Sequence, residues 1–160
     1  MKALIIYDDA TFALRANFLL RNAAHGANSK NDLDVNLWRS NMLRFQSVAR
    51  EALAEALDVD LIVFAGPQVS LLPRWLKGWL EEWAARRQVQ DAALALIEDQ
   101  ALTTGRTSIA AELCEFARQH ELGFVASRES QKIEATPLPF ETSGYPRDRR
   151  STPDAMCAVA

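Results

Sequence analysis

A regular alternation of short apolar runs with amphipathic segments constrains the fold of this chain most strongly. The short runs predict strands, and the segments whose apolar residues recur at helical spacing predict helices. Alternation of this kind implies a parallel sheet with right-handed crossover connections. The expected strands span residues 2–7, 33–38, 61–65, 92–97 and 124–127, and the expected helices span residues 12–24, 47–57, 73–87 and 108–122, the last with Gly123 as its stop.

The second and third expected strands differ in a way that predicts the strand order. Leu33, Val35 and Leu37 alternate with polar residues, whereas residues 61–65 are apolar throughout. Alternation leaves one face of a strand in water, as at a sheet edge, and a continuous apolar run suits a central strand covered on both faces. We therefore expect a three-layer αβα fold, with a five-stranded parallel sheet of order 2-1-3-4-5. This is the arrangement of flavodoxin-like and receiver-like folds.

The repeating pattern ends at about residue 128, and this predicts the domain boundaries. Residues 1–128 are expected to form one flavodoxin-like domain, since 160 residues suffice for a single core. Residues 129–160 combine scattered charge with Pro137, Pro139, Pro146 and Pro153. They are expected to form an extended or disordered tail.

Composition and charge restrict the classes of partner. The formal net charge of −3 offers no basic field for nucleic acid or an anionic membrane. No apolar run reaches the roughly 20 residues that span a bilayer, and no signal segment follows Met1. Cys114 and Cys157 lack metal-type spacing and are expected to be free thiols, as in a reducing cytoplasm. A cytoplasmic protein without nucleic-acid or membrane partners is therefore expected.

The topology predicts where a ligand would bind. In open α/β sheets, ligands occupy the crevice outside the carboxyl ends of the strands, at the switch point between strands 1 and 3. Three loops are expected to meet at this point, because they follow the first, third and fourth strands. Their candidate crevice residues are Asp8, Asp9, Thr11, Gly66, Pro67, Ser70 and Asp99.

The acidic pair Asp8-Asp9 has two readings. It can cap the first helix and interact with the positive end of the helix dipole, a role open also to Thr11. Alternatively, the two carboxylates can bind a hard cation such as Mg²⁺, which prefers oxygen ligands. Glu98 and Asp99 would join them if the loops converged, and such an acidic crevice would raise individual carboxylate pKa values. Neither reading is excluded by the sequence.

Two groups of apolar residues are candidates for an interface. Trp75 and Trp79, together with Trp83, recur at every fourth position of the third helix and are expected either to pack on the sheet or to meet a partner. Gly78, beside them, would allow another backbone to approach closely. Leu14 and Phe18 fall opposite the apolar stripe of the first helix, and a pair one turn apart there suggests a homodimer contact.

The third strand and third helix resemble one known family. Residues 58–67 read DVDLIVFAGP, and residues 72–80 read LPRWLKGWL. This pattern resembles flavodoxin-like NAD(P)H-dependent FMN reductases, which implies FMN as a cofactor and hydride transfer as the activity. The family's first loop, rich in hydroxyl and amide side chains, is matched poorly, because Asp8 and Asp9 put carboxylates where the flavin phosphate would sit.

The first strand resembles a second family. Tyr7-Asp8-Asp9 is similar to the acidic pair of response-regulator receiver domains, which implies Mg²⁺ binding and phosphorylation of an aspartate after the third strand. Ala65 stands at the phosphoacceptor position, and the lysine expected after the fifth strand is absent. Without that carboxylate, no aspartyl phosphate can form. Residues 79–93 also resemble uncharacterised bacterial proteins of this general fold, which implies no function.

These observations favour a binding or regulatory module without its own catalysis. The chain has the fold pattern of both families but lacks the phosphoacceptor aspartate and a good phosphate loop for FMN. The alternative is a divergent FMN-dependent NAD(P)H reductase. Neither FMN nor Mg²⁺ is favoured as a cofactor.

Overall fold

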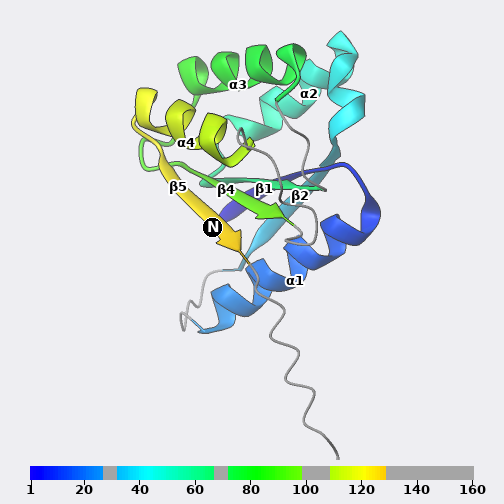
Figure 1. Cartoon of the computed structure of the whole chain (residues 1–160), viewed down its shortest axis with the longest axis vertical. Coiled ribbons are helices and arrows are strands. Elements are labelled where there is room, and N and C mark those ends of the chain that lie inside the picture. Colours follow the sequence, from blue (N-terminus) through cyan, green and yellow to red (C-terminus); the bar gives the residue numbers. More distant parts are fainter. Residues whose placement is uncertain (27–31, 67–71, 99–108, 129–160) are drawn as a thin grey trace, which may run out of the picture. The chain divides into compact units, whose positions relative to one another are not determined.

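The structure, a computed structural model, describes residues 1–26, 32–66, 72–98 and 109–128 (Figure 1). The expected tail, residues 129–160, lies outside this part of the chain. The elements are β1 (Lys2–Tyr7), α1 (Ala10–Gly26), β2 (Asp34–Arg39), the 3-10 helix η1 (Ser40–Arg44), α2 (Gln46–Ala56), β3 (Leu61–Ala65), α3 (Arg74–Arg86), β4 (Ala93–Glu98), α4 (Ile109–Gln119) and β5 (Gly123–Arg128).

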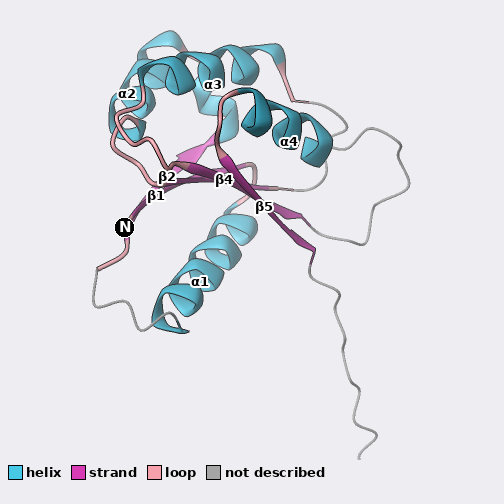
Figure 2. Cartoon of the chain, turned by 90° about the vertical axis from the view of Figure 1, so that its left-hand side faces the viewer, coloured by secondary structure: helices cyan, strands magenta, loops and turns pink. Residues whose placement is uncertain are grey.

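The five strands form one parallel sheet of order β2-β1-β3-β4-β5. α1 lies on one side of this sheet, and α2, α3 and α4 lie on the other, which makes three layers (Figure 2). The expected α/β fold class and strand order are therefore confirmed, and the topology is flavodoxin-like. No helix in the described ranges is long and apolar enough to cross a membrane.

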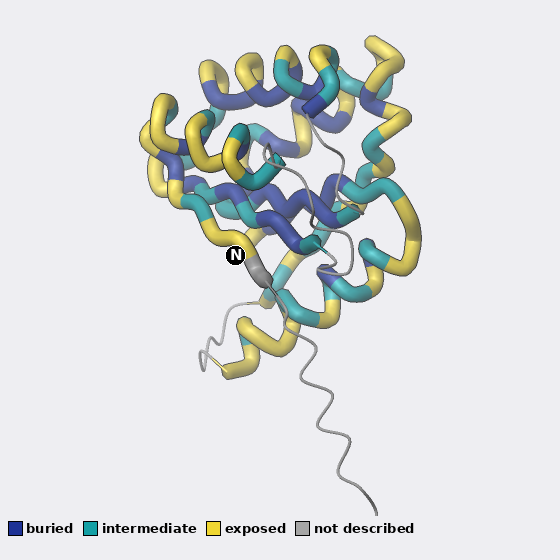
Figure 3. Tube along the Cα trace, in the orientation of Figure 1, coloured by how far each residue is buried: buried dark blue, intermediate teal, exposed yellow. Residues whose placement is uncertain are grey.

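The larger core lies between the sheet and the three helices α2, α3 and α4. Leu4, Ile62 and Leu94 of adjacent strands belong to it, together with Trp79 and Trp83 of α3. Figure 3 shows buried residues along the central strands and on the sides of the helices that face them. The two indole N–H groups donate hydrogen bonds to carbonyls of α2: Trp79 to Ala49 at 3.0 Å and Trp83 to Ala56 at 2.9 Å. These bonds satisfy the polar atoms that burial of two indoles would otherwise leave unpaired.

The smaller core lies under α1. Since successive strand residues point to opposite faces, Ile5 and Val63 face α1 while their neighbours Leu4 and Ile62 face the larger core. Ala16 of α1 packs against them, and its small side chain brings the helix close to the sheet. β2 is at the edge, so its residues are half-buried or exposed, which explains the alternation in its sequence.

Most element boundaries fall within one or two residues of those expected, but α4 and η1 differ. α4 ends at Gln119, three residues early, and Glu121 adopts a left-handed conformation with φ of 55°. The prediction that Gly123 stops this helix is wrong, because Gly123 is the first residue of β5 and donates its N–H to Ala92 at 3.2 Å. The short η1 turn was not expected.

Candidate functional site

A small crevice lies at the carboxyl edge of the sheet, beside the ends of β1, β3 and β4. It has a volume of about 60 Å³. Its polar lining comes from Asp8 after β1, Ser40 after β2 and Glu98 at the end of β4. Its apolar wall includes Phe64 of β3 and the first turns of α3. This position is the switch point that the strand order predicts for a ligand.

Asp8 is held in this crevice by its neighbours. Its backbone N–H donates to the carbonyl of Ala65 at 3.2 Å, and its carboxylate accepts a hydrogen bond from the Ser40 hydroxyl. A Cβ atom built on Gly66 would lie 2.6 Å from Oδ2 of Asp8. A larger residue at position 66 would therefore require the Asp8 side chain to move.

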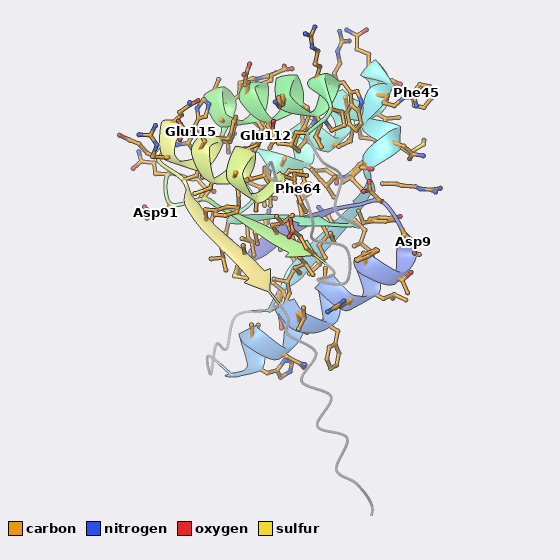
Figure 4. All side chains as sticks on the ribbon, viewed as in Figure 1. Asp9, Phe45, Phe64, Asp91, Glu112 and Glu115 are labelled. Atoms are coloured by element: carbon orange, nitrogen blue, oxygen red, sulfur yellow. The ribbon has the colours of Figure 1, made fainter. Side chains whose placement is uncertain are left out.

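Asp9 has a different role, although it is adjacent. Its Oδ1 accepts hydrogen bonds from the Thr11 N–H at 2.8 Å and from the Thr11 hydroxyl. Its carbonyl accepts the first helical N–H groups, from Phe12 at 3.1 Å and Ala13 at 3.2 Å. Asp9 therefore caps α1, at the start of that helix in Figure 4. The hydrogen bonds from the Thr11 side chain and backbone lower the pKa of this exposed carboxyl below its ordinary value.

The capping interpretation is thus confirmed for Asp9, and Thr11 helps to hold the cap. The helix α1 begins two residues earlier than expected. Asp8 and Asp9 direct their carboxylates to separate partners, Ser40 and Thr11, so they do not act as a pair. Within the described ranges, no group of three or more His, Cys, Asp or Glu side chains could hold a metal ion.

Ala65 occupies the position at which receiver domains carry the phosphoacceptor. It is only 3% exposed and packs in the smaller core against α1. A buried methyl group at this position offers no oxygen to a phosphoryl group. The candidate residues Pro67, Ser70 and Asp99 lie outside the described residues.

The tryptophans of α3 divide between the crevice and the core. Trp75 lines the crevice and is half-buried, whereas Trp79 is 5% exposed and bonded to α2. Trp79 is therefore a core residue, in keeping with the first of the two alternatives for these tryptophans. The helix itself begins at Arg74, with the carbonyl of Pro73 accepting the N–H of Leu76 and of Lys77, each at 3.0 Å. Pro73 is therefore the cap and not the first helical residue.

Sequence reasoning missed Ser40 and Trp75 as crevice residues. Ser40 directly follows β2, so the rule that strands end at one edge could have found it. Trp75 is expected from its helical spacing to pack on the sheet or to meet a partner, and that spacing does not show that it lies beside the ends of the strands. In comparisons with known proteins, no family model, no curated protein and no solved structure matches this chain.

Proposed function

We propose that this chain is a binding or regulatory module without catalysis of its own, and that its ligand enters the crevice at the carboxyl edge of β1, β3 and β4. The observation that carries this proposal is the identity of two residues beside the crevice, Asp8 and Ala65. Asp8 lies over Gly66, where a flavin phosphate would require hydrogen-bond donors. Ala65 is a buried methyl group where a receiver requires a carboxylate.

The lining of the crevice favours a small cationic or hydrogen-bond-donating group. Asp8, Ser40 and Glu98 provide oxygen acceptors, and Phe64 and Trp75 provide an apolar wall. An anion in this position would meet like charges at a cost on the order of a few kcal/mol. At about 60 Å³, the crevice is smaller than the pockets of roughly 300–1,000 Å³ that hold whole small-molecule ligands, which favours a small head group over a flavin ring.

The alternative function is a divergent FMN-dependent NAD(P)H reductase. It is supported by the flavodoxin-like topology and by α3, which starts directly after Pro73 beside the crevice. The two functions differ in colour and in activity. The purified module is expected to be colourless, to gain no thermal stability from excess FMN and to oxidise no NAD(P)H with added flavin. Flavin-dependent oxidation of NAD(P)H would establish the reductase instead.

Binding in the crevice can be tested with butylammonium as a probe and butanol as the uncharged control. Butylammonium is expected to raise the melting temperature of the wild type, and Asp8→Asn is expected to reduce the rise because the variant loses one of the two acidic side chains of the crevice, Asp8 and Glu98. Asp9→Asn is the matched control, since asparagine also caps helices and position 9 lies outside the crevice lining. A rise in Asp8→Asn equal to that of the wild type would contradict binding beside Asp8.

The proposed setting follows from composition. A net charge of −3 gives no attraction for nucleic acid, and two cysteines without metal-type spacing suit a reducing cytoplasm. We therefore propose that the module acts in the cytoplasm, with a small molecule or a protein as its partner. The proposal of a bacterial source rests only on the resemblance of residues 79–93 to uncharacterised bacterial proteins.

A further inference from the structure

The outer side of α1 carries an exposed apolar pair. Leu14 is 70% exposed and Phe18 is 64% exposed, and they lie one turn apart. Ala13 and Ala16 are buried on the inner side. At 100° per residue, the apolar pair therefore points away from the sheet to which α1 belongs. Burial of such a pair requires another surface.

A second apolar surface lies on the same side of the sheet, on β4 and β5. Phe124 packs against the larger core, so its neighbour Val125 points to the side of α1, where it is 61% exposed. Ala93 and Ala95 of β4 point the same way and are half-buried. We call Ala93, Ala95 and Val125 the β4–β5 shelf. In the described ranges, α1 is the only helix on this side of the sheet (Figure 2).

We infer that a second copy of this chain covers this face, in a two-fold symmetric dimer in which the two α1 helices lie side by side between the two sheets. A two-fold interface must be self-complementary, because one copy presents the same patch as the other. This face meets that requirement. The projecting pair Leu14 and Phe18 of one copy packs on the β4–β5 shelf of the other, whose alanines leave room for a helix, and the same contact is made in return.

The charges at the ends of α1 select the antiparallel orientation. α1 itself contains no acidic residue, but the carboxylate of its cap, Asp9, lies at its amino end. Arg21 and His25 lie near its carboxyl end. In an antiparallel pair that crosses near residue 16, Leu14 lies level with the partner copy's Phe18. Arg21 then lies level with residue 11 of that copy, beside the Asp9 cap. Opposite charges and opposite helix dipoles therefore meet at both ends.

The oligomeric state of the full chain tests this dimer, independently of any ligand in the crevice. Sedimentation equilibrium of the wild type is expected to show dimers at tens of micromolar. Phe18→Asp is expected to raise the dimer dissociation constant at least about 30-fold, the change that a central interface residue gives. Leu14→Asp serves as a second variant, and circular dichroism verifies that both are folded. Phe45→Asp is the matched control, because Phe45 is 55% exposed but follows η1, on the far side of the molecule from this face (Figure 4).

Two results would overturn the proposal: a wild type that stays monomeric at several hundred micromolar, or a Phe18→Asp variant that dimerises as well as Phe45→Asp. Arg21→Gln tests the orientation. It weakens an antiparallel dimer by removing an attraction to the partner copy's cap, and it strengthens a parallel dimer by removing a repulsion between like charges. A tighter Arg21→Gln dimer would therefore overturn the antiparallel arrangement.

Discussion

The two faces of the sheet are built differently, although they belong to the same five strands. One face is covered by three helices, and its core contains two buried tryptophans bonded to α2. The other face is covered, in the described ranges, by α1 alone, and its core consists of small and aliphatic residues. The comparison indicates that the three-helix face supplies most of the folding stability, while the α1 face retains apolar surface for association.

Loss of an aromatic side chain should distinguish the two faces most clearly. Trp83→Ala is expected to lower the free energy of unfolding by about 3–5 kcal/mol, because a fully buried indole and its hydrogen bond to Ala56 are lost. Phe18→Ala, on the α1 face, is expected to change the stability of the monomer by less than about 0.5 kcal/mol. Urea unfolding at submicromolar concentration measures both. Equal losses would remove the distinction between the faces.

The next largest difference between the two faces is expected when a larger side chain replaces an alanine. Ala52 of α2 is fully buried in the larger core, whereas Ala95 lies half-buried on the β4–β5 shelf. Ala52→Val is expected to cost about 1–3 kcal/mol, because the closely packed core must shift. Ala95→Val is expected to cost less than about 0.5 kcal/mol in the monomer, since position 95 is only half-buried and valine suits a strand. Thermal and urea unfolding measure both changes, and a large loss at position 95 would show that the shelf is already covered.

The strand order and the αβα layers could be predicted because hydrophobic periodicity records which face of each element is buried. The alternation in β2 identified an edge, and the continuous run in β3 identified a central strand. The separate roles of Asp8 and Asp9 could not be predicted in this way. They depend on the close approach of Gly66 to Asp8 and on Ser40 at the end of β2, contacts between residues distant in sequence. The exposure of Val125 in the described part of the chain could not be predicted either, because an apolar strand residue has the same pattern whether it is covered or not.

A carboxylate on the three-helix face should make its stability depend on pH. Burial tends to raise the pKa of Glu112, but hydrogen bonds from the Leu72 N–H at 2.8 Å and Lys77 Nζ at 3.0 Å outweigh it and lower this pKa below its ordinary value. A lowered pKa stabilises the fold above the unfolded-state value of about 4.3, and the stabilisation is lost as the pH falls through the folded-state pKa.

Glu112→Gln is therefore expected to cost about 1 kcal/mol at pH 7 and less at pH 3, as the folded-state carboxylate becomes protonated. Urea unfolding at the two pH values measures the difference. Glu115→Gln, on the same helix, is the control: its pair with Arg118 is exposed, so solvent screens the charges and a smaller change is expected (Figure 4). A cost for Glu112→Gln that is the same at both pH values would mean that the side chain acts through packing alone.

The smallest expected effect compares two glycines. Gly78 lies inside α3, and within the described part of the chain no atom lies within 4 Å of an added Cβ. Gly78→Ala should stabilise the fold by about 0.5–1 kcal/mol, because alanine favours the helix. At Gly123 of β5, an added Cβ would lie 3.1 Å from the Cβ of Ala93, so Gly123→Ala should give no such gain. Thermal unfolding measures both variants. A gain at position 123 equal to that at position 78 would mean that Ala93 and β5 move apart freely, and the shelf would then be too loosely held to form a defined dimer surface.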